Sequence, residues 1–209
     1  MRPWVDLYVQ HQALRAMNDR EAANEVRQVL RKLSEKPYAV LRRDAQARLV
    51  EGRVPQSPSV QYTLGRERGG EELELAALPP PLQEAVALRN ARLAVLLRFD
   101  RRAERLQELN IMLSGQRHDD SPWAVAVHLP HDRQTADRPQ GDRDGIGACG
   151  HAALHCHVGP TLDHEPKVRV PFPPLRPAQL VEWAVSQVVP TAEFEPAPWS
   201  GVEAMLRPS

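Results

Sequence analysis

Apolar residues near the start of the chain recur at a helical period. Those between Pro3 and Met17 are spaced loosely in this way and predict a first helix. Asn18, followed three residues later by Glu21, has the form of a capping box and precedes another run of apolar residues at helical spacing. We therefore expect a helix to begin or continue there, and a shorter helix to follow over residues 39–51.

The apolar period changes to two in the next segment. Apolar and polar residues alternate from Val60 to Leu64, and alternation resumes at Leu73 and Leu75 after a stretch rich in glycine. Alternation of this kind is typical of half-buried strands. Residues 59–77 are therefore expected to form a β-hairpin with a long loop.

Residues 82–114 are expected to form the longest helix, between three prolines and Gly115. Within it, residues at alternating spacings of four and three define a seam that Arg92 and Arg102 interrupt. Apolar residues at such spacing bury against a partner helix, as in a coiled coil. The seam is either the core side of a single domain or a surface for self-association or a protein partner. Its apolar members are Leu88, Val95, Phe99, Leu106, Leu109 and Leu113.

The second half of the chain favours strands. Residues 123–129 are continuously apolar except for one histidine, which predicts a buried strand, and alternation predicts two more strands near residues 154–158 and 168–172. The polar stretch 130–147 is expected to be a mobile surface loop. Pro177 is expected to start a last helix, before a proline-rich tail.

These elements predict an α+β protein: a helical N-terminal part with a β-hairpin, followed by a small antiparallel sheet and a C-terminal helix. The first region, mainly helical with the hairpin 59–77, covers residues 1–115. The second region, a small sheet plus a helix and the proline-rich tail, covers residues 122–209. The two regions form either one composite domain or two small ones.

Composition and charge limit the kinds of partner that the protein is expected to bind. The 209 residues contain 27 basic and 27 acidic side chains, so no overall field attracts nucleic acid or a membrane surface. The N-terminus lacks the pattern of a signal peptide, and the sequence contains no apolar run of about 18 residues. We therefore expect no nucleic-acid partner, no membrane span and a cytoplasmic location.

Cysteine and histidine concentrate in one part of the chain. Both cysteines and seven of the eight histidines lie between residues 118 and 164, most densely over residues 149–157. If residues 154–158 form a strand, Cys156 points to the face opposite its two histidine neighbours. One thiolate and three imidazoles then form a candidate zinc site. Its residues are Cys149, His151, His155 and His157, with His128, His131 and His164 as more distant candidates.

The alternative interpretation of this cluster is structural, with Cys156 as a small core residue and the histidines as the polar face of a strand. Other motifs are incomplete. A phosphate loop of the cysteine phosphatase type needs an arginine where this chain has Leu162. The glycines of residues 145–150 match a dinucleotide motif in letters but lack the strand before and the helix after them.

Because no complete catalytic motif is present, the leading hypothesis is a non-enzymatic intracellular interaction protein with a regulatory, adaptor or structural role. It would bind a protein partner, or itself as a homo-oligomer, through long amphipathic helices, and no cofactor is expected for it. The alternative hypothesis is a zinc-binding protein or a metal-dependent enzyme centred on the cysteine and histidine cluster at residues 149–157.

Overall fold

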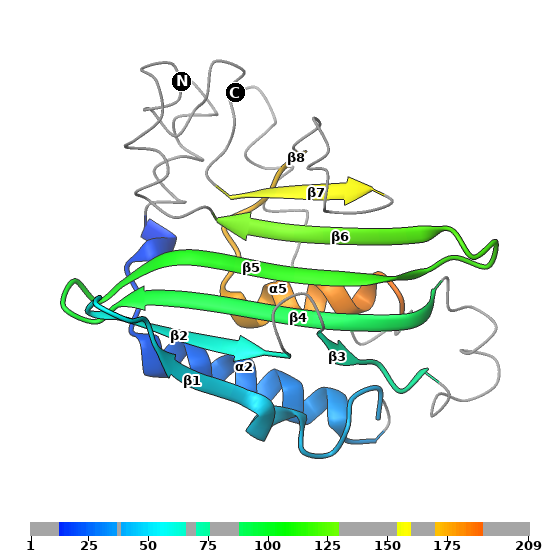
Figure 1. The fold of residues 1–209 in the computed structure, drawn as a ribbon, viewed down its shortest axis with the longest axis horizontal. Helices are drawn as coiled ribbons and strands as arrows, with labels where there is room; N and C mark the ends of the chain where they lie inside the picture. The colour runs from blue at the N-terminus through cyan, green and yellow to red at the C-terminus, as the bar shows by residue number, and fades with distance from the viewer. Residues whose placement is uncertain are drawn as a thin grey trace, which may run out of the picture.

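An eight-stranded antiparallel sheet forms the centre of the fold (Figure 1). The structure is a computed structural model that describes residues 13–36, 39–65, 70–75, 88–129, 154–159 and 170–189. Seven strands follow one another in the order β1-β2-β4-β5-β6-β7-β8, and β3 pairs with β4 beside β2. The strands are β1 Leu49–Arg53, β2 Ser59–Leu64, β3 Glu71–Glu72, β4 Arg89–Asp100, β5 Arg105–Gln116, β6 Pro122–Leu129, β7 His155–Gly159 and β8 Val170–Pro171.

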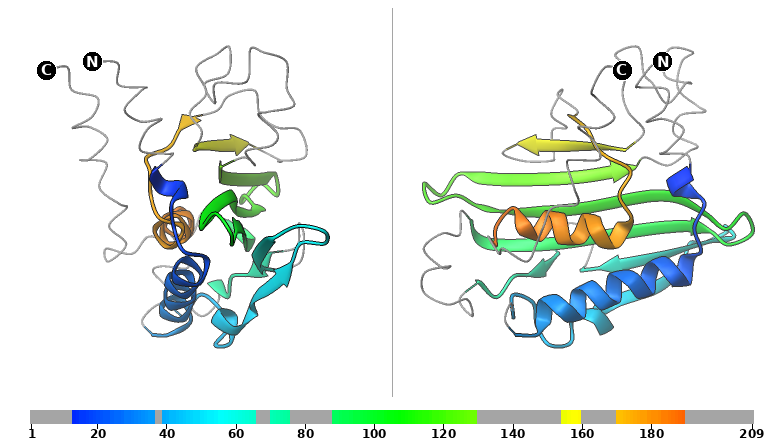
Figure 2. Two further views of the ribbon diagram at one scale, coloured as in Figure 1. Left: turned by 90° about the vertical axis from the view of Figure 1, so that its left-hand side faces the viewer. Right: turned by 180° about the vertical axis from the view of Figure 1, so that it is seen from behind.

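Two α-helices, α2 (Asp19–Ser34) and α5 (Pro177–Ser186), lie side by side on one face of the sheet (Figure 2). Asn18 caps α2, because its side chain accepts hydrogen bonds from the backbone of the first turn. Arg176 at the start of α5 forms ion pairs with two glutamates of α2. The predicted helix starts at Asn18 and Pro177 are therefore confirmed.

The predicted fold class is wrong, because the N-terminal part is not mainly helical and the sheet is not small. Residues 39–51 contain only a short 3₁₀ helix, η1 (Ala45–Arg48), before strand β1 begins. Strand β1 pairs antiparallel with β2 along its whole length, from Leu49↔Leu64 to Arg53↔Val60, which a helix over these residues could not do. Leu49 is buried while Val50 is exposed.

The predicted long helix over residues 82–114 is wrong where the structure describes it, from residue 88 on, and with it the coiled coil; residues 82–87 lie outside the described residues. Strands β4 and β5 form a long antiparallel hairpin instead. Every second residue of β4 from Ala91 to Phe99 is buried, which is a period of two. The turn has neither glycine nor proline at residues 101–104; the side chain of Asp100 accepts backbone hydrogen bonds from Arg102 and Ala103 and closes it.

A β-bulge explains the helix-like spacing in β5. Pairing shifts between Arg98↔Glu108 and Phe99↔Leu106, which leaves one extra residue in β5. Leu106 and Leu109 therefore both face the core although they are three residues apart. All six apolar residues of the expected helix seam are buried in the core.

The predicted hairpin of residues 59–77 is also wrong, although β2 is one of its strands. β2 pairs with β1 and β4, and β3 pairs with a different part of β4. Gly65 and Gly70 approach so closely that a Cβ on Gly65 would lie 2.5 Å from the Cα of Gly70. Both have positive φ, so this approach favours glycine at each position.

The strands expected near residues 123–129 and 154–158 are present as β6 and β7. The sheet has two different faces. The face toward α2 and α5 carries the apolar core, including Leu97, Ile111 and Val127, whereas the other face of the central strands mixes polar residues with partly buried apolar ones such as Leu96 and Met112. No helix in the described residues is long and apolar enough to cross a membrane.

Candidate metal centre

His128 reaches the face of the sheet opposite the two helices because of its position in β6. Val125, Val127 and Leu129 of this strand are buried in the core. Residues in a strand alternate between its two faces, so Ala126 and His128 point to the other side. The apolar residues of β6 thus fix the direction of the histidine.

Strand β7 brings two more histidines to the same face. His155 is the cross-strand partner of His128, and His157 is the partner of Ala126. Cys156 lies between them and belongs to the core on the helix side. The expectation that His155 and His157 share one face, with Cys156 on the other, is confirmed.

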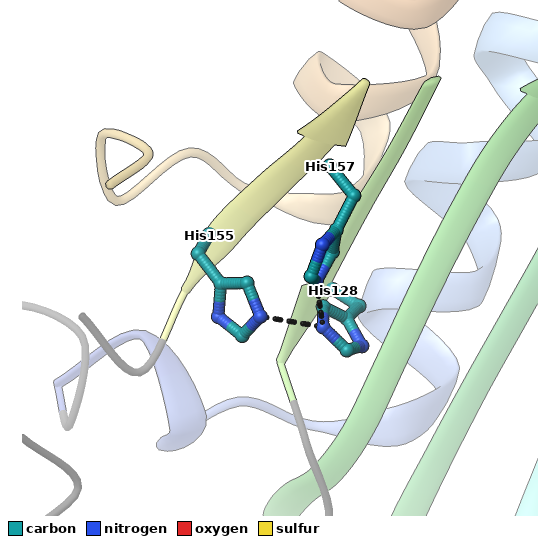
Figure 3. Close-up of side chains that lie close together, drawn as sticks. All are labelled: His128, His155 and His157. Atoms are coloured by element: carbon teal, nitrogen blue, oxygen red, sulfur yellow. Dashed lines mark hydrogen bonds between the residues drawn. The ribbon is translucent and has the colours of Figure 1, made fainter. Parts of the chain in front are cut away.

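The three imidazoles converge through the same ring nitrogen (Figure 3). The Nε2 atom of His128 lies 2.6 Å from the Nε2 of His155 and 2.9 Å from the Nε2 of His157. The three ring centroids are 4.2, 4.7 and 4.8 Å apart, with the rings steeply inclined to one another. Three side chains from two neighbouring strands therefore direct nitrogen atoms toward a single region, which we call the histidine centre.

Burial makes this region different from an ordinary polar strand face. His155 and His157 are each only 3% exposed, and His128 is half-buried. The cross-strand partner of His157 is Ala126, which has a small side chain. Buried polar groups need partners, so the ring nitrogens of these three imidazoles each need a hydrogen bond or a metal ion.

Hydrogen bonds between neutral imidazole rings satisfy the three converging Nε2 atoms only in part. A neutral imidazole carries one N–H donor and one acceptor nitrogen, so the Nε2 of His128 is either a donor or an acceptor. It lies within hydrogen-bond distance of two other Nε2 atoms and has a single hydrogen or lone pair to direct at them. A cation between the rings would accept all three lone pairs, so the histidine centre can hold a metal ion.

The spacing fits a metal after a small adjustment. Two imidazole nitrogens bound to one tetrahedral zinc at about 2.0 to 2.1 Å lie about 3.3 Å apart. The two short Nε2 to Nε2 distances are below this value by about 0.4 and 0.7 Å. Small side-chain rotations suffice to open them.

Cys156 is a core thiol. It is 4% exposed, and its Sγ lies 3.7 Å from the backbone carbonyl oxygen of His157. Burial raises its pKa to about 11, which keeps the thiol protonated and a poor ligand. The structural interpretation of this cysteine is therefore confirmed.

The predicted zinc site is brought together in part. His155 and His157 belong to the histidine centre, whereas Cys149 and His151 lie outside the described residues, as does the loop 130–147. Sequence reasoning left His128 among the distant candidates. The missed signal was the pairing of two expected strands: β6 beside β7, each with period two, places His128 opposite His155.

Comparison with known proteins gives no family for this chain. No family model, curated protein or solved structure matches it. The histidine centre is therefore the feature that indicates function in the described residues.

Proposed function

We propose that this protein binds a transition-metal ion, zinc first, through the Nε2 atoms of His128, His155 and His157. The observation that carries the proposal is the convergence of three Nε2 atoms in a buried region, with two contacts of 2.6 and 2.9 Å. Imidazole is a ligand that suits zinc, copper, iron and nickel.

Zinc is the first candidate because three imidazoles form one of its recurrent ligand sets. In sites with three protein ligands, water or substrate takes the fourth position. The strand backbone supports metal binding, since both β6 and β7 are paired with neighbouring strands of the sheet. A rigid frame of this kind lowers the ordering cost of binding.

The proposal replaces the long-helix hypothesis as the leading one. Helices α2 and α5 pack against the sheet, and the seam expected to contact a partner is buried in the core. Partner binding and self-association stay predictions, with no surface assigned to them. The metal hypothesis, in contrast, now includes His128 as a ligand, which the sequence pattern placed among the more distant candidates.

Metal uptake by the full chain, produced without a histidine tag, tests the proposal. Zinc content is measured by mass spectrometry after gel filtration, and cobalt uptake is followed by the visible bands of tetrahedral Co²⁺. We expect one equivalent of metal per chain. His128→Ala, His155→Ala and His157→Ala should each lose it while keeping the far-ultraviolet circular dichroism of the wild type.

Two control variants separate the histidine centre from other side chains. His118→Ala removes an exposed histidine after β5, and Cys156→Ser changes the core side of β7. Both should still bind one equivalent. A wild-type protein that takes up neither metal, or histidine variants that bind like the wild type, would contradict the proposal.

A further inference from the structure

Asn110 is the neighbour of His128 on the side away from β7. It is the cross-strand partner of His128 between β5 and β6, as His155 is between β6 and β7. Directly paired residues of antiparallel strands lie on the same face. Asn110, His128 and His155 therefore form one row across the sheet, with His128 in the middle.

The side-chain oxygen of Asn110 is buried and accepts no hydrogen bond from the described residues. Leaving a buried acceptor unsatisfied costs free energy, so such atoms are few in folded proteins. An acceptor held in this state beside a cluster of imidazoles is suited to receive an N–H from a ring that moves toward it.

His128 has the ring nitrogen that such an acceptor needs. Its Nε2 faces His155 and His157, and Figure 3 shows its other ring nitrogen on the far side of the ring from His155. When Nε2 binds a metal, the hydrogen of a neutral imidazole must be on Nδ1. That N–H then needs an acceptor on the side of the ring away from the metal.

Metal entry moves His128 in the required direction. The Nε2 atoms must separate by about 0.4 to 0.7 Å to surround a zinc ion, as the two short distances show. His128 lies on β6, between β5 and β7. A shift of its ring away from the two histidines of β7 is a shift toward the β5 side, where Asn110 lies.

We propose that Asn110 is the positioning residue of the metal centre: when metal binds, its Oδ1 accepts a hydrogen bond from Nδ1–H of His128 and holds the Nε2 lone pair on the metal. This inference rests on the proposed metal-binding function. Acceptors behind metal-bound histidines fix the tautomer and the ring direction, and their loss costs about 10- to 100-fold in metal affinity.

Three variants test the role of the acceptor. Asn110→Leu keeps the size of the side chain but removes the oxygen, and should weaken zinc affinity about 10- to 100-fold. Asn110→Asp keeps an acceptor and should bind zinc at least as tightly as the wild type. Met112→Leu, on the same face and strand two residues away, should leave the affinity unchanged. Affinities come from competition with a chromophoric zinc chelator.

A spectroscopic measurement separates positioning from simple stabilisation. In zinc-loaded wild type labelled with ¹⁵N-histidine, His128 should carry its proton on Nδ1, and that proton should exchange slowly with water. In Asn110→Leu it should exchange faster, although melting of the metal-free variant should be no lower than that of the wild type, because an unsatisfied acceptor has gone.

The outcomes distinguish the two proposals. If the wild type binds no zinc, the metal-binding function and the role of Asn110 both fail. If the wild type binds zinc through the three histidines and Asn110→Leu binds it equally well, with an unchanged proton exchange rate, the role of Asn110 alone is overturned.

Discussion

Cys156 and His157 are neighbours in sequence but lie in opposite chemical environments. The thiol is in the apolar core beneath the helices, and the imidazole is in the histidine centre on the other face. This division follows from the period of the strand. Cysteines and histidines that are close in sequence therefore do not all reach the same site, because the side chain of Cys156 points to the other face of the sheet.

The reactivity of Cys156 tests this placement. In Cys149→Ser it is the single cysteine, and its raised pKa of about 11 leaves much less thiolate at pH 8 than a thiol of ordinary pKa 9.0 has. Because the thiolate is the nucleophile, labelling by a disulfide reagent should be at least about 100-fold slower than for a free thiol. Labelling should become fast and complete in denaturant. Fast labelling of the native variant would place Cys156 at the surface.

The N-terminus of α2 is attached to the sheet by a group of four polar side chains. The hydroxyl of Tyr62 donates to Asp19 at 2.9 Å, and Arg101 binds both Asp19 and Glu51. Burial alone would raise the pKa of Asp19, but hydrogen bonds from Arg101 and Tyr62 outweigh it and lower that pKa. The ionised form of Asp19 is thus favoured in the folded state.

Replacing Asp19 by asparagine should therefore reduce stability in a pH-dependent way. A lowered folded-state pKa contributes stability that is complete above the unfolded value near 3.9 and is lost as pH falls through the folded value. We expect Asp19→Asn to lower the free energy of unfolding by about 1 kcal/mol at pH 7, a difference that shrinks below pH of about 4. Urea unfolding at both pH values measures it, and a pH-independent difference would argue against the ionised contact.

The hairpin of β4 and β5 shows which part of the fold the sequence pattern could predict. Strands β2, β6 and β7 and the starts of α2 and α5 agree with prediction because their periods are unbroken and their ends carry caps or prolines. In β5, the bulge places Leu106 and Leu109 three apart and imitates a helix. The glycine-free turn after Asp100 gave no stop signal, so one long element was expected.

Substitutions in β5 should report the strand period directly. Leu109→Glu puts a charge in the core and should destabilise the protein by at least about 3 kcal/mol or unfold it, since both the apolar contact and the solvation of the carboxylate are lost. Ser114→Glu, on the half-buried opposite face, should remain folded. Thermal melts followed by circular dichroism compare them. Equal tolerance at both positions would be inconsistent with this strand register.

The histidine centre lies toward one end of the strand order. β7 is paired with β6 on one side and with the two-residue strand β8 on the other. His128 on β6 and His155 on β7 are 27 residues apart in sequence. Only their pairing in the sheet brings them together, which is why reasoning from local spacing gave His155 and His157 but not His128.

A metal in this position should fasten β7 to the rest of the sheet. Opening of β7 separates its two histidines from His128, so bound metal resists that opening by mass action. With free zinc at about 100 times its dissociation constant, the stabilisation is about 2.7 kcal/mol, or about 100-fold slower exchange for amides that exchange through this opening.

Hydrogen exchange measured by mass spectrometry, with and without zinc, tests this expectation on the peptide containing β7. Exchange in β7 should slow about 100-fold in the wild type and remain unchanged in His157→Ala, which keeps the strand but lacks a ligand. Amides of β2, on the far side of the central hairpin, should respond less, because their local openings leave the histidine centre intact. Zinc that binds stoichiometrically but leaves β7 exchange unaltered would mean that the metal does not bridge β6 and β7.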